Sequence, residues 1–334
     1  MIPAELSSRH RSSWQAELAA AITDPAELLA ALALDPALLP AARSAAAGFR
    51  LRVPWSYVRR MRRGDLHDPL LRQVLPVGAE LAEVPGFVAD PLGERAANPV
   101  PGLLHKYRGR ALLVTTGACA VHCRYCFRRE FPYAEQVSGE GRWDAAIAAI
   151  AADRSIEEVI LSGGDPLVLS NARLGALTAQ LATIGHVRRV RVHTRTPVVL
   201  PSRVDDGLVQ WLASLRRPVV VVHVNHAQEI DAELAAAFAQ LRAAGATVLN
   251  QSVLLAGVND SAGALVALST ALHDAGVLPY YLHLLDRVRG AAHFDVPAER
   301  ARALMRDIGA RLPGYLVPRL VREEAGAPGK TPVL

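Results

Sequence analysis

The three cysteines of this 334-residue chain, Cys119, Cys123 and Cys126, all fall within one stretch of eight residues. Since cysteine occurs nowhere else, packing does not explain these thiols. Thiolates spaced by four and three residues can converge from a short loop on one cubane [4Fe–4S] cluster. They provide three ligands and not four, so one iron of such a cluster would be free to bind and act on a small molecule.

Two other uses of these cysteines stay open. His122 could complete a Cys3His zinc site, but it adjoins Cys123, and such sites usually come as paired knuckles, whereas this sequence has no second pair. A disulfide framework fits less well, because the number of cysteines is odd and nothing in the sequence suggests secretion. The spacing therefore favours an iron–sulfur cluster.

Lysine is almost absent from the chain. Among 37 basic residues, only Lys106 and Lys330 are lysines. A lysine retained in such an arginine-rich chain can be one whose amine is needed, because an amine forms a Schiff base and a guanidinium does not; chance survival is the alternative. Lys330 lies in a loop of small residues, Ala325-Gly-Ala-Pro-Gly-Lys330-Thr-Pro, which would let a planar cofactor approach the backbone. We expect Lys330 to bind a cofactor and to act in catalysis.

The composition is that of an alanine- and leucine-rich globular protein with 51% hydrophobic and 5% aromatic residues. This length allows one large domain, or one domain with an appended helical piece. No apolar run is long enough to span a membrane, and residues 1–10 lack the apolar core of a signal peptide, which favours a cytoplasmic protein. The formal net charge is +5, but the arginines are dispersed. We therefore expect neither a membrane nor a nucleic-acid partner.

The hydrophobic pattern changes along the chain. Residues 12–90 read as helices, one of which begins at the acidic cap Asp24 followed by Pro25. From residue 111 onward, short β-branched runs alternate with alanine-rich amphipathic stretches, which predicts six β-α units. The predicted strands are 111–116, 158–162, 188–194, 218–224, 247–255 and 278–285, and the predicted helices are about 143–153, 171–184, 205–215, 231–244, 261–275 and 297–312. Right-handed crossovers make such units either a doubly wound sheet or an incomplete barrel.

Polar residues follow every predicted strand, and chemistry in such folds belongs at the carboxyl ends of the strands. The cysteines follow the first strand, and Gly163-Gly164-Asp165 follows the second. A glycine pair directly after a buried strand would bring backbone groups against a ligand, although a tight turn is the alternative. Further groups of this kind are His193-Thr-Arg195, His223-Val-Asn225-His226, Gly257-Val-Asn259-Asp260 and His283-Leu-Leu-Asp286.

The spacing Cys-x3-Cys-x2-Cys, with the aromatic Tyr125 before the last cysteine, resembles the signature of the radical S-adenosylmethionine enzymes. Together with the glycine pair and Lys330, it makes the chain similar to the lysine 2,3-aminomutase family over roughly residues 65–334. Within that family it most resembles the shorter branch that makes (R)-β-lysine for elongation factor P. The motifs that carry the resemblance are Asp68-Pro-Leu, Leu104-His-Lys-Tyr107, Arg124-Tyr-Cys-Phe-Arg128-Arg129, Ser162-Gly-Gly-Asp-Pro-Leu167, Asn250-Gln-Ser-Val-Leu-Leu255, Gly257-Val-Asn-Asp260 and Pro279-Tyr-Tyr-Leu282.

The resemblance implies an α/β fold, namely a partial (β/α)6 radical S-adenosylmethionine barrel preceded by a helical region. We expect the helical region at residues 1–100, the barrel at 101–314 and a C-terminal segment carrying the cofactor lysine at 315–334. The implied cofactors are a [4Fe–4S] cluster, S-adenosyl-L-methionine and pyridoxal 5′-phosphate. The implied activity is that of an isomerase converting L-α-lysine to β-lysine.

The resemblance also assigns roles to single residues. The cluster ligands would be Cys119, Cys123 and Cys126. Lys330 would hold pyridoxal phosphate covalently, while the remaining cofactor-binding residues would be Lys106, Tyr107, Arg110, Gly163, Gly164, Asp165 and Gln251. Arg128 would bind the substrate carboxylate as a bidentate pair, and Asp260 would bind the distal ammonium of lysine. The longer family members have a second aspartate seven residues before the cofactor lysine, where this chain has Glu323; this departure leaves its substrate-binding role open.

The implied partners are L-lysine, a reductant such as flavodoxin or ferredoxin, and a functional link to an elongation factor P lysine ligase; a homo-oligomer is left open. Three alternatives to this function remain at this point. One is an aminomutase acting on glutamate or arginine. Another is a radical methyltransferase or maturase without pyridoxal phosphate. The third is a zinc-stabilised RNA- or protein-binding module.

Overall fold

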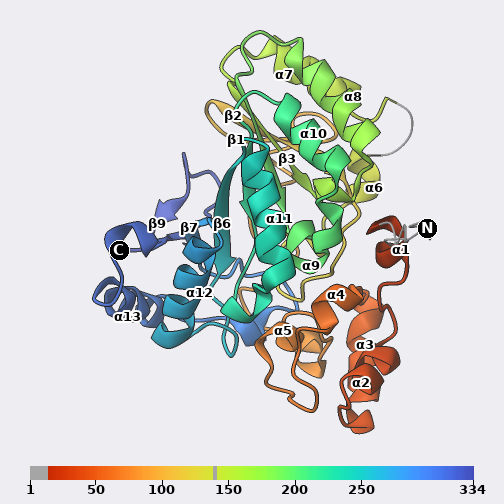
Figure 1. Ribbon diagram of the computed structural model, residues 1–334, viewed down its shortest axis with the longest axis vertical. Coiled ribbons are helices and arrows are strands. Elements are labelled where there is room, and N and C mark those ends of the chain that lie inside the picture. The colour runs from red at the N-terminus through yellow and green to blue at the C-terminus, as the bar shows by residue number, and fades with distance from the viewer. Residues whose placement is uncertain (1–13, 138–140) are drawn as a thin grey trace, which may run out of the picture.

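The computed structural model of the chain describes residues 14–137 and 141–334. Its centre is one nine-stranded sheet whose strands follow each other in chain order from β1 to β9 (Figure 1). Strands β2 to β8 are parallel, whereas β1 and β9 pair antiparallel with their neighbours at the two edges. Among the described strands, β1 does not pair with β9, so the sheet remains open. The expected partial barrel is therefore confirmed.

All six predicted β-α units are present. The strands are β2 (Arg110–Thr116), β3 (Glu158–Gly163), β4 (Arg189–Thr194), β5 (Val219–Val222), β6 (Thr247–Val253) and β7 (Leu278–His283). The helices that follow them are α7 (Asp144–Ala152), α8 (Asn171–Ala182), α10 (Asp206–Ser214), α11 (Ala232–Ala243), α12 (Ala262–Asp274) and α13 (Ala298–Gly309). Short helices α6 (Tyr133–Gln136) and α9 (Thr196–Val199) lie in the connections.

The sequence did not predict three of the strands, namely β1 (Leu103–Tyr107), β8 (Arg319–Arg322) and β9 (Thr331–Pro332). β1 forms a tight hairpin with β2, in which Gly109 has a φ of 79°. β8 adds a seventh parallel strand beside β7, and β9 returns antiparallel to β8. This return fixes Lys330, the residue before β9, close to Glu323, the residue after β8.

The barrel helices begin where short polar side chains cap them and pack their apolar sides on the sheet. Ser170 accepts a hydrogen bond from the backbone amide of Arg173, and Asp231 accepts one from that of Leu234, as N-cap residues do. The main core lies between the sheet and these helices; examples of its buried residues are Leu177, Val222 and Phe238. This core holds the strands in register and thereby fixes the residues at their carboxyl ends.

The N-terminal region is helical, as predicted. It contains α1 (Trp14–Ala19), α2 (Pro25–Ala31), α3 (Leu39–Gly48), α4 (Trp55–Val58) and α5 (Pro69–Arg72). Asp24 caps α2 through a 2.9 Å hydrogen bond from the backbone amide of Ala26, and Pro25 opens the helix. The apolar residues of the region form a second core that also takes in Ala120 and Val121 of the cysteine loop. These helices lie together at one end of the molecule (Figure 1).

No helix in the described part of the chain is long and apolar enough to cross a membrane. Residues 1–10, on which the expectation about a signal peptide rests, lie outside the described residues.

Candidate active site

One cavity of about 480 Å³ is lined by residues along the barrel strands, from Arg110 and Glu158 at the amino ends of β2 and β3 to the loops at the carboxyl ends. It brings together residues that are far apart in the sequence, from β1 to the C-terminal segment. Its lining includes nearly all residues predicted for the site, namely Lys106, Tyr107, Arg110, Cys119, Cys123, Cys126, Arg128, Gly163, Gly164, Asp165, Gln251, Glu323 and Lys330. The predicted residues thus share one chamber, with the cysteine loop at one part of its wall and Lys330 at another.

Asp260 is the exception, and the structure does not place it in the cavity wall. Its carboxylate turns back to accept a 3.0 Å hydrogen bond from the backbone amide of Gly257. Gly257 has a φ of 70°, so the chain reverses there and directs Asp260 into its own turn. Asp260 does not cap α12 either, since Ser261 does so. The prediction that Asp260 faces a substrate ammonium is therefore not supported by this geometry.

The cysteine loop follows β2 and is attached to the glycine pair. The amide of Gly164 donates to the carbonyl of Thr116 at 2.7 Å, and that of Asp165 donates to the carbonyl of Ala118 at 2.8 Å. A Cβ atom on Gly164 would lie 2.3 Å from the carbonyl oxygen of Ala118, so no side chain fits there. Gly163 has a φ of 108°, which a residue with a side chain rarely adopts. The glycine pair is therefore required for the path of the cysteine loop.

The arrangement of the thiols fits a cluster better than a single metal ion. Among the described residues, no three His, Cys, Asp or Glu side chains lie close enough together to bind one metal ion. The Nδ1 atom of His122 lies 2.9 Å from the carbonyl oxygen of Arg50, a contact with the N-terminal region. Since all three cysteines line the same cavity, they are suited to surround an object larger than one ion. Zinc binding is therefore disfavoured by the spacing of these side chains in the described part of the chain, and not by the contact of His122.

Asp165 holds backbone in place. Its carboxylate accepts hydrogen bonds from the amides of Leu167 at 3.0 Å, Arg195 at 2.7 Å and Thr196 at 2.8 Å. The hydroxyl of Thr194 donates to it as well, at 2.6 Å. A carboxylate with four donors is already well satisfied, so Asp165 connects the glycine pair to the end of β4.

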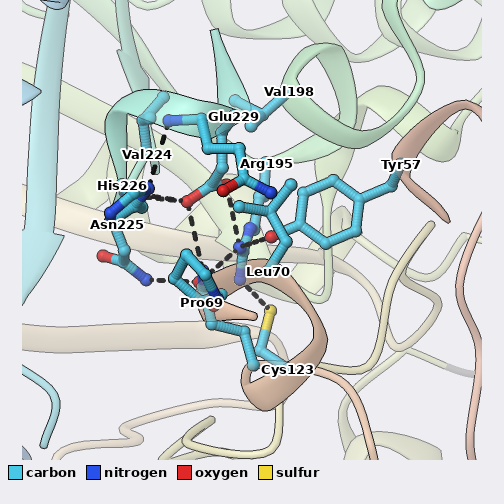
Figure 2. A network of polar contacts seen from close by, with 12 residues as sticks. Tyr57, Pro69, Leu70, Cys123, Arg195, Val198, Val224, Asn225, His226 and Glu229 are labelled. Carbon is cyan, nitrogen blue, oxygen red and sulfur yellow. Dashed lines mark hydrogen bonds and ion pairs between the residues drawn. The ribbon is translucent and has the colours of Figure 1, made fainter. Parts of the chain in front are cut away.

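A buried polar network lies behind the cysteine loop, centred on Arg195 (Figure 2). Its Nη1 atom donates to the Sγ atom of Cys123 at 2.9 Å and also to the hydroxyl of Tyr125. Its Nη2 atom pairs with Glu229 at 3.0 Å. The sequence indicated that Arg195 ends a strand, but a contact between residues 72 positions apart has no local signature.

The part of the cavity around Lys330 carries alternating charges. Arg128 forms a two-pronged pair with Glu94, at 2.7 Å for each contact. Lys106 lies 3.0 Å from Glu94 and 2.5 Å from Glu323. Glu323 in turn lies 3.9 Å from the Nζ atom of Lys330. Burial alone would raise the pKa of Glu94, but Arg128 and Lys106 lower it to about 2. The predicted cations Arg128 and Lys106 are therefore held by carboxylates, and Glu94 was not predicted.

Besides Glu323, two side chains lie near the amine of Lys330. Its Nζ atom lies 2.8 Å from the Nε2 atom of His283 and 5.0 Å from the centre of the Tyr281 ring. Burial lowers the pKa of Lys330 to about 8, although Glu323 and Asp286 oppose this shift. About a tenth of the amine is thus uncharged at pH 7, far more than for an ordinary lysine, and formation of a Schiff base requires this uncharged form.

The carboxylate of Asp286 lines the cavity, whereas that of Asp260 does not. Burial and the negative charge of Glu323 raise its pKa to about 7, against the opposing effect of Lys330. A cationic group entering this region would favour its ionised form. The sequence placed Asp286 at the end of the last predicted strand, but did not distinguish it from the polar residues that end the other strands.

The cavity wall also contains buried polar atoms that lack a partner among the described residues. They include the hydroxyl of Tyr107, the Nε2 atom of His193 and the Nε atom of Arg195. The guanidinium of Arg110 lies 4.6 Å from the centre of the Tyr107 ring. Because buried polar groups are normally satisfied, these atoms fit a ligand that offers hydrogen-bonding oxygen atoms, such as a phosphate.

Comparison with known proteins gives consistent matches. The family model of the radical SAM superfamily matches residues 113–264. The chain is 50% identical over 330 residues to L-lysine 2,3-aminomutase of Escherichia coli (strain K12), which covers 98% of this chain and 96% of that protein. It is 46% identical to the protein of the same name from Haemophilus influenzae, covering 99% of this chain and 98% of that protein. It is 37% identical to that of Clostridium subterminale, covering 85% of this chain and 69% of that protein.

Proposed function

The chain belongs to the lysine 2,3-aminomutase family of radical S-adenosylmethionine enzymes, and from this we propose that it is an isomerase that converts L-α-lysine to β-lysine. The observation that carries the proposal is the single cavity that unites three cysteines, a glycine pair and a buried lysine of lowered pKa. A methyltransferase or maturase would leave the buried Lys330 amine and its carboxylates unexplained.

We assign the cofactors to residues that fit them. Cys119, Cys123 and Cys126 would hold the [4Fe–4S] cluster, and Gly163 with Gly164 would lie against S-adenosylmethionine. Lys330 would hold pyridoxal phosphate, with its phosphate near Tyr107 and Arg110. When bound, the cluster and S-adenosylmethionine supply a radical that abstracts hydrogen from an unactivated carbon, and pyridoxal phosphate supplies a π-system over which an unpaired electron delocalises.

The residues of the chain supply position and charge. Arg128 presents its guanidinium to the cavity with one edge neutralised by Glu94; its Nη1 atom makes a 3.3 Å contact with Ser162, which a substrate carboxylate can replace. Asp286 and Glu323 face the amine of Lys330, and both stabilise its positive charge. Once that amine is neutral or bonded to a cofactor, Glu323 keeps its pair with Lys106 at 2.5 Å, whereas Asp286 has room for another cation. We assign the distal ammonium of lysine to this place.

This pair of carboxylates decides among substrates. Glutamate would bring a third negative charge to Asp286 and Glu323, which is unfavourable in a buried site. Lysine and arginine both carry a distal cation, so their discrimination depends on length and shape. Holding the substrate at both ends fixes its β-carbon relative to the adenosyl group, and such positioning is a main contribution of an enzyme to this chemistry.

We further propose the cellular setting. The product would be (R)-β-lysine for the modification of elongation factor P, which places the enzyme before a lysine ligase that consumes it. The reductant would be a flavodoxin or ferredoxin in a cytoplasm that keeps thiols reduced. Support comes from the family and, for the branch, from the near-complete coverage of the proteins from Escherichia coli and Haemophilus influenzae.

The test is a product assay under anaerobic conditions. Protein reconstituted with iron and sulfide is incubated with S-adenosylmethionine, pyridoxal phosphate, a reductant and lysine, glutamate or arginine in turn. Mass spectrometry should detect β-lysine, and Lys330→Ala and Cys123→Ala should each abolish it. Deoxyadenosine without any β-amino acid would retain the radical chemistry and refute lysine as substrate.

A further inference from the structure

Arg195 contacts Cys123, one of the three predicted cluster ligands, and its hydrogen bonds go to none of the predicted substrate-binding residues Arg128, Asp260 and Glu323. It follows β4 and is 6% exposed. Its Nη1 atom lies 2.9 Å from the Sγ atom of Cys123, the middle cysteine of the loop, so a positive charge is held against one thiol (Figure 2).

The rest of the guanidinium is fixed in place. Its Nη2 atom donates to Glu229 at 3.0 Å, to the side-chain oxygen of Gln73 at 2.7 Å and to the hydroxyl of Tyr57 at 3.1 Å. Glu229 is itself held by the backbone amide of Asn225 at 2.8 Å. Both terminal nitrogens have partners, while Nε has none among the described residues, so Arg195 cannot turn away from Cys123 without breaking several buried hydrogen bonds.

Glu229 gives this arrangement a direction. Its carboxylate lies on Nη2, whereas the sulfur lies on Nη1. The ion pair of Arg195 and Glu229 is neutral as a whole, which reduces the free-energy cost of burying it. Its positive member, Arg195, is the one closer to the sulfur of Cys123. Arg195 therefore contributes a positive potential at Cys123, and Glu229 contributes a smaller negative one from the far side of the guanidinium.

We propose that Arg195 is a positioning residue that raises the reduction potential of the cluster through Cys123, with Glu229 limiting the increase. This rests on the proposed function in that the three cysteines bind the cluster. The step is the uptake of one electron by [4Fe–4S]2+ to give [4Fe–4S]+, and the electron comes from a one-electron donor of the flavodoxin or ferredoxin class. Reduction adds negative charge to a cluster that already carries three thiolates, and a fixed cation on one sulfur stabilises that added charge.

A second buried arginine provides a matched control. Arg203 is fully buried and donates to the carbonyls of Leu167 at 2.5 Å and Leu169 at 3.2 Å. Its guanidinium also lies 4.5 Å from the centre of the Trp14 ring. It does not line the cavity. Loss of Arg203 therefore tests the general cost of removing a buried arginine without removing a contact to a cysteine.

The experiment is a redox titration of the reconstituted holoenzyme with dithionite, without lysine, followed by the electron paramagnetic resonance signal of the reduced cluster. Iron and sulfide contents are measured first. Arg195→Gln should lower the ratio of reduced to oxidised cluster at a fixed potential by about tenfold, which is a shift of about 59 mV to more negative values. Glu229→Gln should shift the potential in the opposite direction, and Arg203→Gln should leave it unchanged.

The outcomes separate the two proposals. If the wild-type chain binds no cluster, the proposed function fails. If it binds a cluster and both Arg195→Gln and Glu229→Gln keep the wild-type potential, the role of Arg195 is refuted. Should Arg195→Gln fail to fold or to bind iron, Glu229→Gln carries the test, and Arg195→Lys, which keeps the positive charge, should stay closer to the wild-type potential than a variant without the charge. Equal shifts in all variants, including Arg203→Gln, would also refute the proposal.

Discussion

The amine of Lys330 lies 2.8 Å from the imidazole of His283, measured between Nζ and Nε2, in the wall of the cavity. Burial lowers the pKa of His283 well below its usual value, so the imidazole is neutral. Its Nε2 atom can then accept a hydrogen bond from the amine of Lys330. Burial also lowers the pKa of Lys330 to about 8. The reactive form of Lys330 is thus available at a pH where an ordinary lysine is almost fully charged.

Capture of pyridoxal phosphate by Lys330 should therefore follow this pKa. The rate of forming a borohydride-reducible adduct should rise with pH to a plateau, with a midpoint near the pKa of about 8 and not near 10.5. Glu323 raises the pKa of Lys330, so Glu323→Gln should move the midpoint to lower pH. The adduct is quantified by mass spectrometry after reduction at each pH. A midpoint above 10 in the wild-type chain would contradict the assigned environment of Lys330.

Asp286 should control the binding of the substrate's distal ammonium. Asp286→Asn should raise KM for lysine by at least tenfold with a smaller change in kcat, since a neutral amide replaces a carboxylate in a buried site. Asp260→Asn is the matched control and should change KM less than twofold, because the carboxylate of Asp260 is bonded to its own turn at Gly257. The reverse ranking would restore Asp260 as the ammonium ligand.

The affinity for lysine should also depend on pH through Asp286. Its pKa is raised to about 7, so the carboxylate is ionised above this pH and becomes neutral below it. KM for lysine should then increase as the pH falls below about 7, and the increase should be absent in Asp286→Asn. Steady-state kinetics between pH 6 and 9 measure this; a pH-independent KM in the wild-type chain would show that Asp286 does not bind the ammonium.

Asp260 and Asp286 both follow predicted strands, but only Asp286 lines the cavity. Hydrophobic periodicity predicted six strands and their helices, because burial of one face imposes a repeat that is visible locally. Both aspartates follow such strands at the same edge of the sheet. Which of them faces the cavity depends on the turn at Gly257, a feature of backbone conformation that the strand pattern does not encode.

The ion pairs of the site could not be predicted from the sequence either. Glu94 comes from an irregular segment without a periodic pattern, and it meets Arg128 across 34 residues. β8 and β9 are short, and β9 contains a proline, which weakens the signal of a strand. The cysteines and Lys330 were recognisable because their chemistry is rare in this composition, whereas carboxylates and arginines are common and acquire roles only through their partners.

The attachment of the N-terminal region to the cysteine loop should be a large contribution to stability. Glu80 of that region accepts from Arg124 at 2.8 Å and from Arg129 at 2.8 Å, and Glu80 and Arg124 are almost completely buried. Glu80→Ala would leave Arg124 buried without its carboxylate, so we expect a loss of about 3–5 kcal/mol in the free energy of unfolding.

Denaturant unfolding of the cofactor-free chain measures this effect, and a second ion pair supplies its control. Glu130 pairs with Arg289 at 3.2 Å, but side-chain exposures of 32% and 59% leave that pair in contact with water. Glu130→Ala should therefore cost less than about 1 kcal/mol. Equal losses in the two variants would mean that burial of Glu80 and Arg124 adds nothing to the contribution of their ion pair.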